Sequence, residues 1–427
     1  MPMSDGELIL REHESAVVPS SRLGERGLDA LALAPADLLR VRLVRRGVEI
    51  RARSVTGVVE LGGLRVRVLP KLFPDGVAVL SWLAYAAGVP VDAESSRTWE
   101  VGAGGLRDLV TAALVSECTR LVRDGLRLDY RREQAVDTVL RGRLDVRAQV
   151  TQRYGQIDRL HLDRFGRRTD VWENVVCRIA LDEAARTAGS LPLRKAARTV
   201  AAAFPLAGRD VGWARRSLRR ARHHRLNARY RAAHLWASVL LDGGGIEDLL
   251  VPGPWRAGSL LVRTDRIWER AVARACVECD GSRDDTVAAL APIRVLEDGA
   301  AARTFRPDAS LVQAGPVRVP VDAKYKDYGS RQVTGNDVHQ LLTYAMACSV
   351  PDAEPSAVLV HPVVGRETHR TIRVRSGRRR VGRVLVVGLD TRRPPTLAAR
   401  SLDTLLALVS GAGAASEQQV RPRAGVS

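Results

Sequence analysis

The predicted fold of this chain is decided by two stretches in its last third, Arg306-Pro307-Asp308 and Val319-Pro320-Val321-Asp322-Ala323-Lys324. The second stretch alternates as a strand, so Asp322 and Lys324 share one face. Residues 311–319 predict strand, turn and strand, and this hairpin would carry Asp308 to the same face. Two carboxylates and an ammonium on one sheet face can hold a divalent cation and a water beside a phosphodiester.

These residue types suit metal-dependent hydrolysis of a phosphodiester. Mg²⁺ binds oxygen atoms and keeps several waters, so Asp308 and Asp322, with the Ala323 carbonyl as a third ligand, would suffice. Lys324 would orient the attacking water and offset the charge that builds on the phosphate. The alternative that these residues have no catalytic role stays open, because short acid–x–lysine motifs also occur by chance in exposed strands.

Two predicted helices flank the hairpin in the sequence. Residues 337–345 predict a helix with Gln340 and Tyr344 four positions apart, and therefore on one face. Residues 267–272 open a helix before the hairpin and bring a third acid, Glu269. Both helices would add polar side chains to the same site.

Together these residues resemble the PD-(D/E)xK nuclease superfamily, and the wider pattern resembles the McrC family, the nuclease subunits of McrBC-type modification-dependent restriction systems. Further matching stretches are residues 57–60, 66–72, 125–126 with Tyr130, 140–145, 173–174 and 358–362. The resemblance assigns metal binding to Asp308 and Asp322 and catalysis to Lys324. It matches Glu269 to a family acid, although Trp268 replaces the preceding Phe and His361 stands where Tyr more often precedes Pro. It gives site support and DNA-backbone contact to Gln340 and Tyr344.

The resemblance implies an endonuclease that uses Mg²⁺ or Mn²⁺ and cuts double-stranded DNA in defence against DNA with modified bases of the 5-methylcytosine type. It also implies a partner, an AAA+ GTPase ring of the McrB type, which residues 1–100 would dock and stimulate. The sequence contains no GxxxxGK[ST] motif, so nucleotide hydrolysis would come from that partner. Two alternatives remain: a non-catalytic DNA-binding adaptor that activates the partner, and a stand-alone DNA repair nuclease.

Composition agrees with a nucleic-acid partner. The 427 residues carry a net charge of +19, mostly from Arg, which suits phosphate contacts, although many of these charges could simply be solvated. Five cysteines and the lack of a secretory segment or membrane-length apolar run predict a cytoplasmic protein with no membrane contact. The pair Cys276 and Cys279 predicts buried thiols rather than a zinc site, since no second pair follows at zinc spacing.

The length predicts an α/β (α+β) protein of several domains. We expect a β-rich partner-docking domain at 1–100, a helical linker or DNA-channel region at 101–255, a PD-(D/E)xK nuclease domain at 256–410 with a central mixed sheet flanked by helices, and a disordered tail at 411–427. Strands are predicted at 39–43, 48–53 and 66–69, with a turn at 62–63, and helices at 77–87, 108–123, 172–185 and 215–231. The last helix is densely basic and could line a DNA path or face solvent. Chain breaks are predicted at 243–245 and 252–254.

Overall fold

The computed structural model describes residues 6–23, 38–61, 64–89, 106–206, 208–242, 260–279, 292–297, 300–312, 318–350, 354–402 and 404. The chain divides into two compact units, unit 1 (Met1–Leu109 and Ile246–Ser427) and unit 2 (Val110–Gly245). Unit 2 is thus inserted in the sequence between the two halves of unit 1. The turn at 62–63, the breaks at 243–245 and 252–254, and the tail at 411–427 lie outside the described residues.

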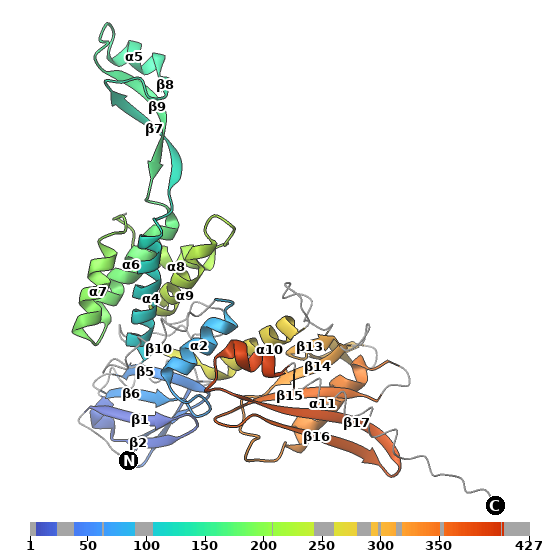
Figure 1. Ribbon diagram of the computed structural model, residues 1–427. Coiled ribbons are helices and arrows are strands. Elements are labelled where there is room, and N and C mark those ends of the chain that lie inside the picture. The colour runs from blue at the N-terminus through green and yellow to red at the C-terminus, as the bar shows by residue number, and fades with distance from the viewer. Residues whose placement is uncertain are drawn as a thin grey trace, which may run out of the picture. The chain divides into compact units, whose positions relative to one another are not determined.

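The first half of unit 1 forms two sheets and a helix (Figure 1). One sheet has the order β1-β6-β5-β10, with β1 (Glu7–Arg11), β6 (Leu64–Leu69), β5 (Val55–Leu61) and β10 (Leu260–Arg263). The other has the order β2-β4-β3, with β2 (Ser15–Val18), β4 (Gly47–Ala52) and β3 (Leu39–Val44). The strands predicted at 39–43, 48–53 and 66–69 are confirmed. Helix α2 (Gly76–Ala86) follows, with Asp75 as its N-cap.

A shared core joins these sheets. Alternate residues of β6, Leu64, Val66 and Val68, are buried, as the period of a half-buried strand requires. Leu261 of β10 packs into the same core, although it lies about 200 positions later in the sequence. The second half of unit 1 therefore begins as a strand of the first half's sheet.

The second half of unit 1 contains a mixed five-stranded sheet of order β13-β14-β15-β17-β16. Its strands are β13 (Ala309–Val312), β14 (Arg318–Ala323), β15 (Ser356–Val363), β17 (Arg379–Asp390) and β16 (Thr368–Ser376). The pairs β14–β15 and β15–β17 are parallel, and the two outer pairs are antiparallel. A two-stranded ribbon, β11 (Ile293–Glu297) with β12 (Ala300–Phe305), precedes them.

Two helices pack on this sheet. Helix α11 (Gly335–Cys348) contacts β14, β15 and β17 and buries Leu341, Leu342 and Ala345 against them. Helix α10 (Thr264–Cys279) contacts β13 and β14 and also packs against α2. The helix predicted at 337–345 and the opening of a helix at 267–272 are confirmed.

Unit 2 contains a three-stranded sheet beside the helices expected for residues 101–255. Its helices are α4 (Leu106–Arg123, which begins in unit 1), α5 (Val146–Gln152), α6 (Trp172–Thr187), α7 (Leu191–Ala201), α8 (Val211–Arg219) and α9 (Arg231–Asp242), with the short η1 (Ala228–Tyr230) before α9. The sheet has the order β7-β9-β8, with β7 (Asp129–Asp137), β9 (Leu160–Arg168) and β8 (Arg143–Leu144). Figure 1 shows β7 and β9 as a long ribbon with α5 near its far end. Cross-strand ion pairs such as Arg164–Glu133 stabilise the pairing of β7 with β9.

The continuous basic helix predicted at 215–231 was wrong. Helix α8 ends at Arg219, and α9 begins at Arg231. Between them the Asn227 side chain accepts a hydrogen bond from the His224 backbone N–H at 2.7 Å and donates one to the Arg222 carbonyl at 3.3 Å. These local hydrogen bonds give backbone N–H and carbonyl groups side-chain partners, which favours a turn over a helix here. Among the described residues, no helix combines the length and apolar character needed to cross a bilayer.

Candidate active site

Asp308 and Asp322 lie opposite one another at the end of the β13–β14 pair. The antiparallel register pairs Ala309 with Val321, and continuing it by one residue sets Asp308 against Asp322. The Oδ2 atom of Asp308 accepts a hydrogen bond from the Ala323 backbone N–H at 2.8 Å. The predicted hairpin is therefore present, although residues 313–317 of its turn lie outside the described residues.

Lys324 links these carboxylates to helix α11. Its Nζ lies 2.8 Å from Asp322 Oδ2 and donates a hydrogen bond to Gln340 Oε1 at 3.1 Å. Gln340 Nε2 in turn donates to the Tyr344 hydroxyl at 2.8 Å, and this hydroxyl donates to the Arg306 carbonyl at 3.3 Å. The spacing of four residues between Gln340 and Tyr344 makes this chain of contacts possible on one helix face.

The site concentrates negative charge in a partly desolvated place. Asp322 is buried, and its side chain is only 3% exposed. Asp308 keeps access to solvent, but the protein around it and the charge of Asp322 raise the pKa of its carboxyl to about 7. Burial lowers the pKa of Lys324, but the contact with the Asp322 carboxylate outweighs it, so the pKa is raised and the ammonium is retained.

Glu269 approaches the pair of aspartates from helix α10. Its charge contributes, after burial and the charge of Asp322, to the raised pKa of the Asp308 carboxyl. Its Oε2 accepts a hydrogen bond from Arg266 at 2.7 Å. Polar contacts therefore connect Asp322, Lys324, Gln340 and Tyr344. Asp308 is connected to them through its hydrogen bond with the Ala323 backbone. Glu269 is related to the site only by its charge.

The donor set fits a hard divalent cation. Asp322 Oδ2 is buried and lacks a hydrogen bond of good geometry, although the Lys324 ammonium lies close to it. Among the described residues there is no ready cluster of three or more His, Cys, Asp or Glu side chains that could hold a metal. Mg²⁺ needs only one or two carboxylates, because it keeps several waters. A cation between Asp308 and Asp322 would also offset the repulsion that raises the Asp308 pKa.

A second polar cluster follows Lys324 directly, and sequence reasoning missed it. Lys326 Nζ lies 2.8 Å from Asp337 Oδ2, and the hydroxyls of Tyr328 and Thr334 donate to the same carboxylate. These contacts tie the segment after β14 to the first turn of α11. Thr334 followed three residues later by an acid is a helix-start signal that could have located this end of the cluster.

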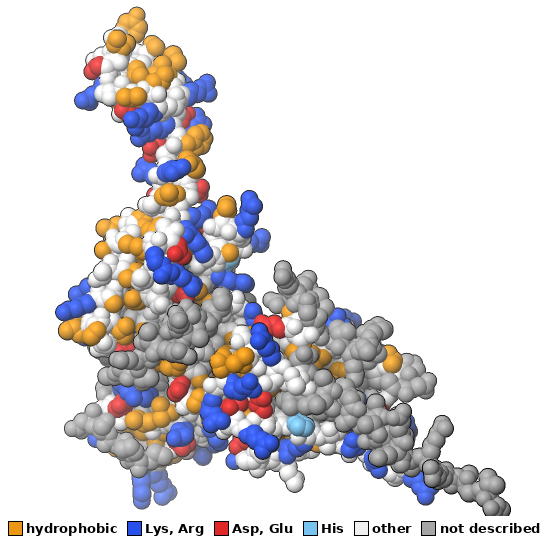
Figure 2. All heavy atoms as spheres, viewed as in Figure 1, with side chains coloured by type: hydrophobic (Ala, Val, Ile, Leu, Met, Phe, Trp, Pro, Cys, Tyr) orange, Lys and Arg blue, Asp and Glu red, His pale blue; other side chains and the backbone are white. Residues whose placement is uncertain are grey.

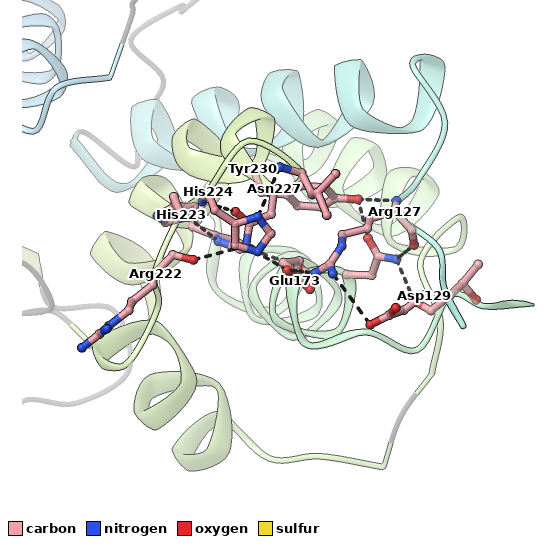
Figure 3. Close-up of polar contacts among 12 residues, drawn as sticks. Arg127, Asp129, Glu173, Arg222, His223, His224, Asn227 and Tyr230 are labelled. Carbon is pink, nitrogen blue, oxygen red and sulfur yellow. Dashed lines mark hydrogen bonds and ion pairs between the residues drawn. The ribbon is translucent and has the colours of Figure 1, made fainter. Parts of the chain in front are cut away.

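Unit 2 has a buried polar network around Glu173 (Figure 3) and the next residue, Asn174, which together form one of the stretches that carried the resemblance. Glu173 is fully buried and accepts from Arg127 and, at 3.0 Å, from Asn227. Asn174 donates to the Arg127 carbonyl at 2.9 Å and accepts from the Tyr230 hydroxyl at 2.6 Å. The network joins the segment before β7 to α6 and η1 and therefore has a structural role.

Two other groups are His223, within the stretch predicted as the basic helix 215–231, and the pair Cys276 and Cys279. His223 is not on a helix: its Nε2 lies 3.0 Å from Nδ1 of His234, at the edge of the Glu173 network. Cys276 is buried and Cys279 is half-buried, and both carry reduced thiols. The predicted burial is therefore found for Cys276, whereas Cys279 is more exposed than predicted.

A protein-family model and solved structures match this chain. The family model described as "McrBC 5-methylcytosine restriction system component" matches residues 50–362, which is most of the chain. The chain belongs to the McrBC family. The resemblance to McrC-type proteins is confirmed. A comparison with curated proteins finds no match.

Two solved structures resemble this McrBC family member. One is a chain of the refined half-complex from the tetradecameric assembly of Thermococcus gammatolerans McrB AAA+ hexamers with bound McrC. It has 16% sequence identity and a TM-score of 0.64, over 93% of the present chain and 99% of that chain, so the likeness is one of fold. The other is the Thermococcus gammatolerans McrBC complex, with 17% identity, a TM-score of 0.47 and coverage of 64% and 88%.

Proposed function

We propose that this McrBC family member is the metal-dependent endonuclease subunit of its restriction system, built on a PD-(D/E)xK site. The observation that carries the proposal is the β13–β14 register, which sets Asp308 against Asp322 with the Lys324 ammonium 2.8 Å from Asp322. The substrate would be a phosphodiester of double-stranded DNA. The net charge of +19 supports a polyanionic substrate.

Asp308, Asp322 and the Ala323 carbonyl would hold Mg²⁺ or Mn²⁺. Such a cation, when bound, polarises a phosphoryl oxygen and lowers the pKa of a water that it binds. Lys324 keeps its positive charge beside Asp322, so it can offset charge that develops on the phosphate.

Gln340 accepts a second contact from the Lys324 ammonium, beside that with Asp322, and Gln340 in turn donates to the Tyr344 hydroxyl. These contacts would preserve the lysine's position while the substrate binds. Glu269 would add negative charge on the α10 side and could assist in proton transfer or metal binding.

We further propose that the chain works with an AAA+ GTPase ring and stimulates its GTPase. The support is the family match and the fold likeness to an assembly of McrB AAA+ hexamers with bound McrC. Residues 1–100 are one candidate for the docking surface.

The β7–β9 sheet of unit 2, together with the loop after α5, is a second candidate docking surface. Three large apolar side chains lie exposed there, Tyr154 at 85%, Ile157 at 87% and Phe165 at 70%. Figure 2 shows hydrophobic side chains gathered on the surface of this part of unit 2. Exposed apolar groups in a cluster are typical of a surface that binds another protein.

The variants Asp308→Asn and Asp322→Asn test the nuclease proposal. Each keeps the size of the side chain but removes the charge that would hold the metal, so DNA cleavage should fall by about a hundredfold or more. The matched control is Asp182→Asn, which removes an exposed partner of Arg178 in unit 2 and should leave cleavage unchanged.

Cleavage and GTPase stimulation should be measured together, with an AAA+ protein encoded beside this chain. Loss of cleavage with stimulation retained supports the endonuclease. Unchanged cleavage in both aspartate variants overturns the assignment of the site, and GTPase stimulation without any cleavage by the wild type favours the adaptor. Metal-dependent cleavage that never requires the ring favours the stand-alone repair nuclease.

A further inference from the structure

Glu12 is a buried carboxylate at the point where the two halves of unit 1 meet. It follows strand β1 directly, and only 2% of it is exposed. Its Oε2 accepts a hydrogen bond from the Tyr325 hydroxyl at 2.9 Å and from the Lys71 backbone N–H at 2.8 Å, and its Oε1 accepts from the Thr264 hydroxyl. Tyr325 and Thr264 lie 313 and 252 positions away in the sequence.

Both distant partners of Glu12 belong to segments that carry proposed active-site residues. Tyr325 follows Lys324 directly, so a shift of its side chain moves the backbone that carries the ammonium. Thr264 is the first residue of α10, and Glu269 lies on the same helix. One carboxylate therefore fixes the start of α10 relative to the end of β14.

Aromatic packing surrounds this junction but leaves open space next to it. The Phe73 ring stacks on the Tyr325 ring with centroids 5.8 Å apart. A cavity of about 420 Å³, lined in part by Glu12, Lys71 and Tyr325, lies beside them. Side chains do not fill that space, so packing restrains Tyr325 less than it would in a close-packed core. The position of Tyr325 therefore depends more on its hydrogen bond to Glu12.

We propose that Glu12 is a positioning residue for DNA cleavage, which makes the end of the first strand part of the support of the active site. Its carboxylate holds Tyr325 and Thr264 so that Lys324 and Glu269 keep their places around the aspartates. The inference rests on the proposed nuclease function. A mere role in folding would predict a loss of stability, whereas a positioning role also predicts slower cleavage by protein that remains folded.

The variant Tyr325→Phe gives the sharpest test, because it removes the hydroxyl that Glu12 accepts but keeps the ring that stacks on Phe73. Cleavage of double-stranded DNA by the full chain with its AAA+ partner and Mg²⁺ should show kcat reduced about tenfold or more. The KM should stay within about twofold, since the surfaces that bind DNA are unaltered. The matched control is Tyr85→Phe, which removes another tyrosine–carboxylate bond of unit 1, to Glu278 at 2.7 Å, and should cleave like the wild type.

Substitutions of Glu12 itself separate geometry from charge. In Glu12→Gln, the amide oxygen can accept from Tyr325 and Lys71, and the amide nitrogen can donate to the Thr264 hydroxyl. This variant should therefore keep most of the activity, whereas Glu12→Ala should lose it to the same extent as Tyr325→Phe. Equal loss in Glu12→Gln and Glu12→Ala, or wild-type kcat in folded Tyr325→Phe, overturns the proposal.

Hydrogen exchange separates this inference from the nuclease assignment. The Lys324 backbone N–H donates to the Val360 carbonyl at 2.9 Å, so its protection reports how well the end of β14 is held. Peptides that cover residues 318–328 should exchange several-fold faster in Tyr325→Phe but not in Tyr85→Phe. Faster exchange supports the coupling even if Asp308→Asn and Asp322→Asn still cleave DNA, and unchanged exchange overturns it whatever those variants do.

Discussion

The indole of Trp268 and the backbone of Lys324 share one acceptor. Trp268 Nε1 donates to the Val360 carbonyl at 3.1 Å, and the Lys324 N–H donates to the same oxygen at 2.9 Å. Trp268 directly precedes Glu269 on α10, whereas Val360 lies in β15, next to β14. The shared oxygen therefore fixes α10 to the strand end that carries the proposed catalytic lysine.

The variant Trp268→Phe should loosen this connection without removing the ring. The loss of one buried hydrogen bond and of part of the ring's volume should lower the free energy of unfolding by about 1–3 kcal/mol. Cleavage should slow by a few-fold, because Lys324 keeps its own bond to Val360. Denaturant unfolding and cleavage rates measure both effects. Trp172→Phe is the matched control, since it shortens another tryptophan, one in unit 2, whose ring packs on His234 with centroids 4.8 Å apart; an equal slowing in both variants would contradict the role of the shared oxygen.

The variant Lys324→Met should separate metal binding from catalysis. Removing the ammonium leaves the buried Asp322 without its ion pair, so a divalent cation becomes the main compensation for its charge. We expect cleavage to fall by about a hundredfold or more while Mn²⁺ affinity is retained or increased. Titration calorimetry with Mn²⁺ on the full chain measures the affinity. Loss of Mn²⁺ binding together with cleavage, in a folded protein, would show that the lysine supports the metal site rather than the reaction.

The stability of unit 1 should fall as the pH rises through the titration range of Glu12. Burial raises the pKa of its carboxyl from 4.5 to about 7, despite hydrogen bonds from Thr264, Lys71 and Tyr325 that lower it. The folded state binds the Glu12 proton more tightly than the unfolded state does, so protonation of Glu12 stabilises the fold. This stabilisation is complete below pH 4.5 and is lost as the pH rises to about 7. The change amounts to about 3 kcal/mol. Unfolding midpoints of the wild type and of Glu12→Gln across this range test it, because Glu12→Gln should lack that part of the slope; parallel curves would contradict it.

The buried ion pair of unit 2 should be costly to break from one side only. Arg127→Met leaves the fully buried Glu173 carboxylate without its cation, which should destabilise unit 2 by about 3–5 kcal/mol. The double variant Arg127→Met/Glu173→Gln removes the unpaired charge and should recover a large part of that loss. Thermal unfolding of the four proteins of this cycle gives the coupling energy. A double variant no more stable than Arg127→Met would show that packing, rather than charge, dominates.

The exposed apolar side chains of unit 2 should tolerate polar replacement in the isolated chain. Ile157→Ser changes a residue that is 87% exposed, so the free energy of unfolding should move by no more than about 0.5 kcal/mol. If this surface binds the AAA+ partner, the same variant should reduce co-elution with the partner and GTPase stimulation. Leu43→Ser, at a residue 77% exposed on β3, is the matched control within residues 1–100. Loss of co-elution with Leu43→Ser alone would favour docking by residues 1–100.

The candidate site was largely predictable because the residues that it joins by polar contacts lie on a hairpin and one helix. Alternation in residues 319–324 and the four-residue step from Gln340 to Tyr344 determine which side chains share a face, and those local periods survive folding. Glu12 carried no such signal. Its partners Tyr325 and Thr264 lie hundreds of positions away in the sequence. No local pattern therefore shows that this one of the chain's many acidic residues is buried.

The errors in unit 2 have a related cause. Apolar and charged residues in 129–137 and 160–168 fit several periods, and the choice of strands depends on pairing between the two segments. The basic stretch from 215 to 231 reads as one helix locally, yet contacts of Asn227 with Glu173 in α6 and with its own loop interrupt it. Tertiary contacts decided both cases.

The pairing of β10 with β5 has a consequence for synthesis on the ribosome. The first sheet cannot gain its last strand until residues 260–263 have emerged, whereas the whole of unit 2 has by then left the exit tunnel or is leaving it. We therefore expect the inserted unit to acquire its structure first during translation, with the first hundred residues waiting in an incomplete state. A nascent chain stalled shortly after unit 2 would leave the edge of β5 open to pairing with other polypeptides, which makes this interval the one in which chaperone protection matters most.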